Sequence, residues 1–472
     1  MLQKYARALM NRKIELNLQP KHTQLLTNAA WVAAPFALSQ FIRLGTSVAV
    51  AWFLAPELLG LMLLINTLRT GAELLTDVGI GQSIVGNKKG NNPEFYNTAW
   101  TIQIIRGIVL FFLLCAAAGP AATIFENPQL NTLLPAVAPI FLLTGFTAPS
   151  QFLLQKSLDV RKQSIFDLSI SAFGALVQIA LAWAIPTIWA LIIGLFVTAA
   201  CSTAVSYVLM DWRTLRFKWD ADSAKEIFLF GRWIFVSSII YFLSINFDRL
   251  YFASIISLST LGIYGIARTF SESILMLFFR FCQIIAFPMI SAAKTRGSDL
   301  RRAIQPIRFL ALMGVAIVLA VLVAVADEFI ELIYDARYEG AGIIMTILLF
   351  GAWFAILASI ADAIMMGIGE PAGVAVANGT KLLILVIGLP LTAASLGFAA
   401  CLGILVFAEL FRYMALMVGN RRLGLGFSRQ DLMMTILFIA LAFIFRQTSM
   451  LMGLTGGVAS WVEQVKALNV LG

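Results

Sequence analysis

Histidine is nearly absent from this chain of 472 residues, since His22 is its one example. A Ser-His or Cys-His nucleophile and a histidine-based metal site are therefore excluded. The sequence contains no G-x-x-x-x-G-K-S/T phosphate loop, so any ATP would be used by another protein. The four cysteines lie apart within apolar segments, as is typical of small buried side chains. We expect a protein that is not an enzyme and holds no metal or cofactor.

Charged residues are also scarce. They make up 12% of the chain, whereas hydrophobic residues make up 60%, and the mean hydropathy is +0.88. These values lie far outside the range of soluble domains. A membrane-spanning helix needs roughly 20 mainly apolar residues, and the sequence offers about a dozen such stretches between short polar breaks. The composition predicts an all-α, multi-pass membrane protein.

The hydrophobic pattern divides the chain into spans of helical length. We place twelve of them, at 25–54, 57–84, 96–119, 129–154, 164–185, 187–210, 228–256, 260–291, 304–326, 341–367, 372–394 and 396–418. A further span is expected at 430–447. The Gly-rich stretch 450–470 is either a weak fourteenth span or a helix at the membrane interface.

Positive charge is distributed unevenly over the loops. With a cytoplasmic N-terminus, the tail and the cytoplasmic loops hold 21 Lys and Arg residues, and the opposite loops hold one, Arg337. Such an asymmetry indicates orientation in a membrane. It also accounts for the net charge of +9 without a nucleic-acid partner, because the basic residues do not gather on one soluble face.

An internal repeat organises the spans. The segment from Trp31 to Gly60 resembles that from Trp233 to Gly262, with an offset of 202 at both ends. Since each half has six spans, both enter the membrane from the same side, and the substrate of such a transporter lies between them. We predict two pseudo-symmetric six-helix bundles, related as parallel repeats, plus one or two C-terminal helices. The expected parts are a cytoplasmic tail (1–24), an N-terminal half (25–210), a cytoplasmic linker (211–227), a C-terminal half (228–418) and an extra helical region (419–472).

Many ionisable residues lie inside the predicted spans. Each costs about 2.5–3.5 kcal/mol at mid-membrane on insertion scales, so it should face water or a partner. Six arginines are candidates for a wet, cationic substrate cavity: Arg43, Arg69, Arg106, Arg249, Arg268 and Arg280. Five acids are candidates for coupling to a proton or sodium gradient: Glu73, Asp77, Asp248, Glu272 and Asp362.

The spacing of these charges leaves a structural role open. Arg69, Glu73 and Asp77 follow at steps of four, which predicts that they share one helical face. Arg69–Glu73, like Arg268–Glu272, could instead be a brace between helices.

Other charged residues have no evident local partner. Asp362 and Lys381 either pair with each other across helices, or Asp362 carries protons or sodium. Snorkelling to an interface is an alternative for Arg106, and it is the interpretation we favour for four other arginines: Arg232, Arg308, Arg412 and Arg446.

Two short stretches carry a resemblance to a known family. Leu54-Ala-Pro-Glu-Leu-Leu-Gly60 and Thr76-Asp-Val-Gly-Ile-Gly-Gln82, together with the run of short loops, resemble the polysaccharide-transport branch of the multidrug/oligosaccharidyl-lipid/polysaccharide exporter (MOP) superfamily. The chain is similar to Wzx-type oligosaccharide flippases over roughly residues 25–420.

This resemblance implies a V-shaped pair of six-helix bundles in the bacterial inner membrane. The implied substrate is an undecaprenyl-pyrophosphate-linked oligosaccharide, moved to the periplasmic leaflet for polysaccharide biosynthesis, and the implied partners are a polysaccharide polymerase and the export machinery. The cavity of the family is lined by the first, second, seventh and eighth helices, which carry five of the six candidate arginines here.

Three rival functions stay open. A multidrug and toxin extrusion antiporter should carry carboxylates and aromatics in its cavity, whereas arginine outnumbers acid in these helices. A peptidoglycan-precursor flippase also carries an anionic lipid. A glycosyl-polymerising membrane enzyme requires one large outside loop, and the longest here is Asp327 to Gly340.

Overall fold

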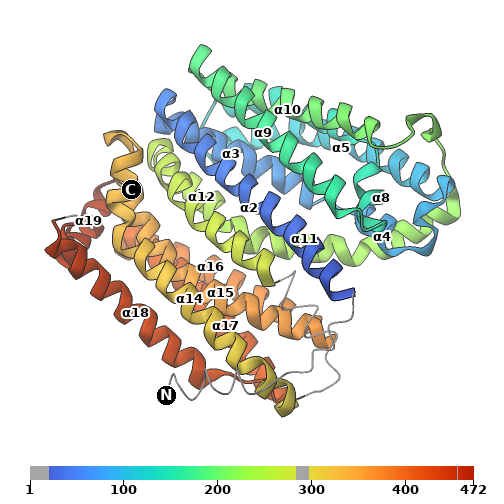
Figure 1. The fold of residues 1–472 in the computed structure, drawn as a ribbon. Helices are drawn as coiled ribbons and strands as arrows, with labels where there is room; N and C mark the ends of the chain where they lie inside the picture. Colours follow the sequence, from blue (N-terminus) through green and yellow to red (C-terminus); the bar gives the residue numbers. More distant parts are fainter. Residues whose placement is uncertain (1–20, 283–296, 454, 472) are drawn as a thin grey trace.

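The structure is a computed structural model that describes residues 21–282, 297–453 and 455–471. Every regular element in these ranges is a helix (Figure 1). The first half contains α2 (Lys21–Phe53), α3 (Pro56–Leu74), α4 (Ile80–Gly86), η1 (Lys88–Asn91), α5 (Pro93–Ile124), α6 (Leu130–Val137), α7 (Ile140–Gly145), α8 (Ser150–Lys156), α9 (Val160–Ala184), α10 (Ile188–Val208) and η2 (Trp212–Thr214). The rest contains α11 (Ala221–Ile255), α12 (Leu258–Phe281), α14 (Gly297–Ile333), η4 (Ala336–Tyr338), α15 (Ala341–Ile368), α16 (Pro371–Leu396), α17 (Phe398–Arg422), α18 (Ser428–Leu451) and α19 (Gly457–Leu471). Residues 1–20 of the predicted tail lie outside the described residues.

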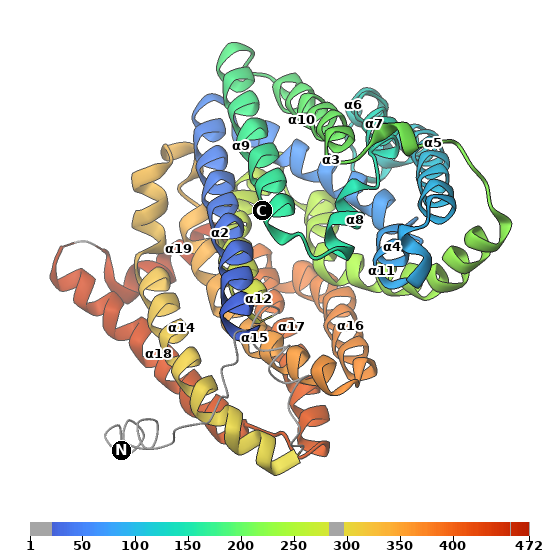
Figure 2. The same ribbon diagram turned by 45° about the vertical axis from the view of Figure 1, so that its right-hand side comes forward.

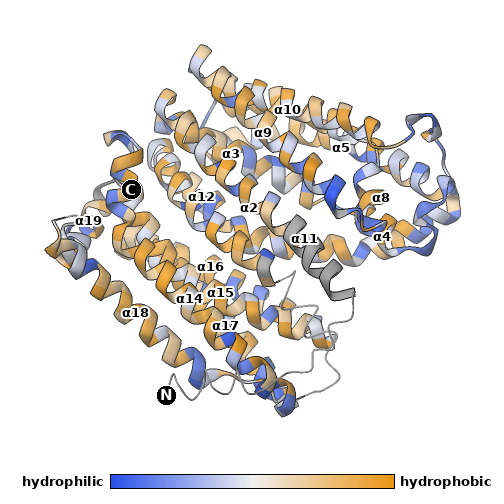
Figure 3. Ribbon diagram, viewed as in Figure 1, coloured by the Kyte–Doolittle hydropathy of each residue, from blue (hydrophilic) through white to orange (hydrophobic). Residues whose placement is uncertain are grey.

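The helices confirm a multi-pass membrane protein. Eleven described helices are long and apolar enough to cross a membrane, and the bent pair Leu130–Gly145 and Ser150–Lys156 makes a twelfth. Apolar residues predominate along helices such as α14 and α18, while polar residues gather at connections such as that between α8 and α9 (Figure 3). α3 is not among the eleven, because its 19 residues include Glu57, Arg69 and Glu73.

Two predicted spans are not continuous helices. The span predicted at 57–84 is interrupted between Leu74 and Ile80, where Gly79 takes a left-handed conformation with a φ of 65°. The span predicted at 129–154 is broken into α6, α7 and α8, with a bend of 51° before Ser150. Irregular backbone at membrane depth requires hydrogen-bond partners and occurs where it lines a cavity or is buried in protein. These two breaks therefore point to the polar interior of the protein.

The repeat predicted from the sequence is confirmed in the helix ends. α2 ends at Phe53 and α11 at Ile255, whereas α3 begins at Pro56 and α12 at Leu258, so both ends keep the offset of 202. The helices up to α10 form one group and those from α12 onward form another, as both ribbon views show (Figures 1 and 2). α11 packs against α3 and α5 of the first group and α16 of the second. The division of the chain at 211–227 stays a prediction.

The two halves touch most closely where α3 crosses α12. A Cβ atom added to Gly60 would lie 2.0 Å from the carbonyl oxygen of Leu258, and one added to Gly262 would lie 2.0 Å from that of Pro56. We call this pair, Gly60 and Gly262, the glycine crossing. Its symmetry follows from the repeat, because the two glycines are 202 residues apart. Only residues without a side chain permit this approach of the two backbones.

Hydrogen bonds seal the same end of the molecule. The Tyr338 hydroxyl donates to the carbonyl oxygen of Leu54 at 2.8 Å, and Trp52 Nε1 donates to that of Ile333 at 2.8 Å. In the same loop, a hydrogen bond from Arg337 lowers the pKa of the Asp335 carboxyl from its ordinary value. The two halves are therefore closed against each other at the end that the charge asymmetry assigns to the outside.

The C-terminal region adds one spanning helix. α18 packs along α14, and α19 turns back against α17 and α18. With 15 residues, α19 is shorter than the roughly 20 residues that a span requires. Among the described residues, α19 is not one of the helices long and apolar enough to cross a membrane.

Candidate functional site

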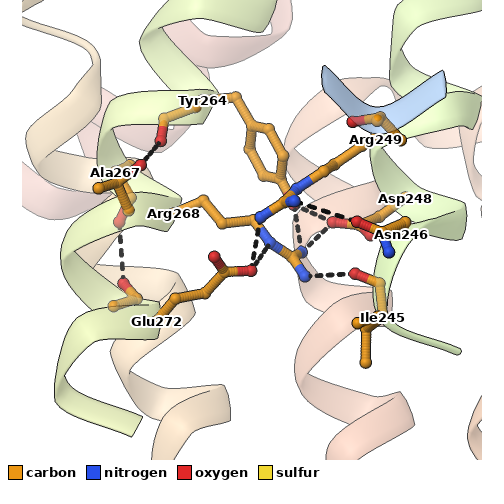
Figure 4. Close-up of polar contacts among 12 residues, drawn as sticks. Ile245, Asn246, Asp248, Arg249, Tyr264, Ala267, Arg268 and Glu272 are labelled. Atoms are coloured by element: carbon orange, nitrogen blue, oxygen red, sulfur yellow. Dashed lines mark hydrogen bonds and ion pairs between the residues drawn. The ribbon is translucent and has the colours of Figure 1, made fainter. Parts of the chain in front are cut away.

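Five charged or polar side chains meet between α11 and α12, and we call them the α11–α12 cluster: Asp248, Arg249, Tyr264, Arg268 and Glu272 (Figure 4). Arg268 is the centre, since its Nε donates to Glu272 at 2.8 Å and its guanidinium also bonds Asp248 and the Tyr264 hydroxyl. Arg249 donates to the same Glu272 oxygen at 2.6 Å. Two arginines thus face two carboxylates, and the cluster neutralises itself. The predicted pair Arg268–Glu272 is confirmed.

A second set of ion pairs lies next to it in the C-terminal half. Lys381 donates to Glu409 at 2.5 Å, and Arg412 bonds both Asp362 and Glu409. Of the two alternatives for Asp362, pairing with Lys381 is wrong, because each of these residues has another partner. Arg412 was expected to snorkel to an interface, but its side chain is only 15% exposed.

Two more arginines contradict the snorkelling interpretation. Arg308 lies beside Asp431 and the ring of Phe427, and it is 4% exposed. Arg446 is fully buried and donates to Asp327 at 2.5 Å. Both pairs join α18 to α14, so these charges hold the extra helix to the core.

In the N-terminal half, charges gather at the end of α3. Arg69 and Glu73 form the predicted pair at 3.3 Å. Asp77 does not continue their helical face, because α3 has already ended at Leu74, and its carboxylate accepts the N–H of Gly79 at 2.9 Å.

Arg106 of α5 reaches across to this helix end. Its guanidinium donates to the backbone oxygen of Glu73 at 2.5 Å and to the Thr76 hydroxyl at 3.1 Å. A cation at the C-terminus of a helix satisfies free carbonyl groups and interacts favourably with the helix dipole. Arg106 therefore stabilises the break after α3.

Arg43 of α2 differs from the other candidates. It is exposed, and it donates to the Ser273 hydroxyl at 3.2 Å and to the backbone oxygen of Thr269 at 3.4 Å. Within the described ranges, no carboxylate lies at ion-pair distance from it. Its charge is thus held by neutral groups and remains available to a ligand.

The charged residues line three cavities. The inter-half cavity, of about 810 Å³, is lined by α2, α3, α7, α9, α10, α11 and α12, and its charged residues are Arg43, Arg69, Arg249 and Glu272. The N-half cavity, of about 770 Å³, is lined by Glu73, Asp77, Arg106 and four glutamines. A small cavity of about 70 Å³ is lined by Asp248, Arg268, Glu272, Lys381 and Glu409.

The six predicted arginines therefore do not share one site. Arg280 lines none of these three cavities, and its guanidinium lies 5.6 Å from the ring centre of Phe36. Sequence reasoning missed Glu409 and the glutamines of the N-half cavity, which are Gln82, Gln103, Gln151 and Gln155. Their only signal in the sequence is a polar side chain within or beside an apolar stretch.

Part of the chain is similar in sequence to known proteins. A family model described as polysaccharide biosynthesis protein matches residues 49–343. The teichuronic acid biosynthesis protein TuaB of Bacillus subtilis is 24% identical over 286 residues, covering 59% of this chain and 57% of that protein. The lipopolysaccharide biosynthesis protein WzxC of Escherichia coli is 21% identical over 322 residues, covering 66% and 64%. The matches thus span less than two thirds of these relatives.

Solved structures resemble the whole fold. The lipid II flippase MurJ in an inward closed conformation aligns with a TM-score of 0.72 at 13% identity, over 92% of this chain and 95% of that one. An inward-facing multidrug resistance MATE family transporter of the MOP superfamily aligns with a TM-score of 0.59 at 12% identity, over 85% and 95%. At such identities the likeness concerns the fold alone.

Proposed function

Because the chain belongs to the polysaccharide biosynthesis protein family and has the fold of MOP-superfamily transporters, we propose that it is a flippase. It moves a lipid-pyrophosphate-linked oligosaccharide across the inner membrane of a bacterium, and it is not an enzyme. The head group passes through the inter-half cavity while the lipid tail stays in the bilayer.

The lining of the inter-half cavity carries this proposal. Its charged residues are three arginines and one glutamate, so the cavity favours an anion. A pyrophosphate is such an anion, and arginine offers permanently charged donors that bind two of its oxygens at once. The cavity also lies between the two repeats, where parallel-repeat transporters hold their substrate.

Arg43 is the residue that we assign to the pyrophosphate. Arg69 and Arg249 already pair with Glu73 and Glu272 at 3.3 and 2.6 Å, whereas Arg43 contacts neutral oxygens. A ligand therefore gains more from Arg43, because it displaces no carboxylate.

Substrate movement requires the two ends of the cavity to open in turn. The glycine crossing closes the end that the charge asymmetry assigns to the periplasm, which supports a cytoplasm-facing loading state. Release then requires α3 and α12 to separate at Gly60 and Gly262. Coupling to a proton or sodium gradient belongs to the proposal as well, with Glu272 as the carboxylate that lines both the inter-half and the small cavity.

Two rival functions predict different substrates. A multidrug antiporter moves cations, which three arginines in the cavity would repel. A peptidoglycan-precursor flippase moves another anionic lipid, so its loss would stop cell-wall synthesis instead of surface polysaccharide synthesis.

The test is complementation of cells that lack the protein. Wild type should restore surface polysaccharide and clear accumulated lipid-linked oligosaccharide. Arg43→Ala should lower the rate at which lipid-linked oligosaccharide is cleared at least about tenfold, since a charge-assisted hydrogen bond contributes about 1.5–3 kcal/mol. The control is Arg422→Ala, which removes an exposed arginine at the end of α17. If cells that lack the protein have normal surface polysaccharide and are more sensitive to cationic drugs, the protein is instead the antiporter.

A further inference from the structure

The N-half cavity differs from the inter-half cavity in its chemistry. Its polar lining includes the side-chain amides of Gln82 from α4, Gln103 from α5, and Gln151 and Gln155 from α8. Hydroxyl groups come from Thr144, Thr147 and Ser202, and the charged residues are one arginine and two carboxylates. This lining offers neutral donors and acceptors and no excess of positive charge.

Among the described residues that line this cavity, Arg106 is the one cation, and it already has hydrogen-bond partners. Arg106 donates to the backbone oxygen of Glu73 and to the Thr76 hydroxyl at the end of α3, as described above. Glu73 and Asp77 face the same space, so a phosphate would meet two negative charges there. The cavity is therefore unsuited to the pyrophosphate that the inter-half cavity fits.

One of the four glutamines supports the backbone, and the side-chain amides of the other three are available to hydrogen-bond a ligand. Gln103 Nε2 donates to the carbonyl oxygens of Thr144, Gly145 and Thr147 at 3.0, 3.3 and 3.2 Å, and so it satisfies the break between α7 and α8. The side-chain amides of the other three make no hydrogen bond to any part of the chain that the structure describes. Each such amide presents two donors and an acceptor with two lone pairs.

The two large cavities are adjacent. Thr144 and Ser202 line both of them. A molecule with its anionic group at Arg43 can therefore extend a neutral, hydroxyl-rich part toward the glutamines. The helix breaks after α3 and α7 both border this second space, so the irregular backbone lies where it shapes the cavity.

We propose that the N-half cavity is a saccharide-binding subsite, in which Gln82, Gln151 and Gln155 bind the hydroxyl groups of the oligosaccharide. This inference rests on the proposed flippase function and assigns the sugar part of the substrate to a separate place. Sugar hydroxyls both donate and accept, which matches amide side chains better than it matches arginines alone.

The test compares two lipids on purified protein in nanodiscs. One is bare undecaprenyl pyrophosphate, and the other is the lipid-linked oligosaccharide purified from cells that lack the protein. Gln151→Leu and Gln155→Leu should each weaken binding of the sugar-bearing lipid about fivefold, the value for one net hydrogen bond, and leave binding of the bare lipid unchanged. The matched control is Gln447→Leu, an exposed glutamine of α18 outside these cavities.

Binding of the bare lipid distinguishes a failure of the proposed subsite from a failure of the proposed flippase function. If wild type binds both lipids equally well, or if the glutamine variants weaken both to the same degree, the subsite is wrong while the flippase function stands. If wild type binds neither lipid, the flippase function itself fails. Retained binding of the bare lipid also shows that each variant is folded.

Discussion

Replacing Gly60 with alanine tests how the transporter closes. The new methyl carbon would lie 2.0 Å from the carbonyl oxygen of Leu258, whereas a close C–H···O contact needs about 3.3 Å. The two helices must therefore separate by about 1 Å. Overpacking of this kind costs about 1–3 kcal/mol. The cost falls on the closed state alone, so the equilibrium should shift about 5- to 150-fold toward the state that is open at this end.

Thiol labelling measures this shift. Thr46 lines the inter-half cavity, so Thr46→Cys in a chain without its four natural cysteines reports access to that cavity. A membrane-impermeant maleimide applied from the periplasmic side should react faster when Gly60→Ala is added. Gly314→Ala is the control, because a Cβ atom there meets nothing within 4 Å. An unchanged labelling rate in a folded Gly60→Ala protein would refute the glycine crossing as the closure.

Two further predictions concern buried polar contacts. Arg446→Met leaves Asp327 buried without its cation, which should cost about 3–5 kcal/mol and lower the melting temperature in detergent. Adding Asp327→Asn should recover most of this loss, and a double variant as unstable as the single one would contradict the pairing. Ser206→Ala removes the acceptor of the Ala148 N–H, which lies 2.9 Å away in the break before α8. The loss of about 1–3 kcal/mol should appear as faster amide exchange in that segment, and unchanged exchange there would count against this role of Ser206.

The order of the spans could be predicted from the sequence because long apolar stretches leave few alternatives. The repeat was equally accessible, since Gly60 and Gly262 keep the offset of 202 that brings them together in the fold. The break after α3 was not predicted, because the apolar residues on both sides of Thr76 and Asp77 together have the length of one span. Hydropathy depends on composition alone. It does not show where a backbone carbonyl at a helix end accepts a hydrogen bond from a side chain such as Arg106.

The ion-pair partners of the charged residues also could not be predicted from the sequence. Arg412 pairs with Asp362 across 50 residues and Arg446 with Asp327 across 119, so no local spacing indicates either contact. From the sequence, snorkelling was the favoured interpretation for both arginines, whereas packing of α18 on α14 buries Arg446 completely. Which charged residues pair with one another thus depends on which helices pack side by side.

The most direct test of the account is transport by the purified protein in liposomes. Lipid-linked oligosaccharide is placed in the inner leaflet, and its appearance outside is followed by digestion with an external glycosidase. We predict that wild type exposes the sugars faster than protein-free liposomes do, and that Arg43→Ala does so at least about tenfold more slowly than wild type. Sugars that stay protected with wild type, in liposomes that instead move a cationic dye, would contradict the flippase and the anionic substrate together.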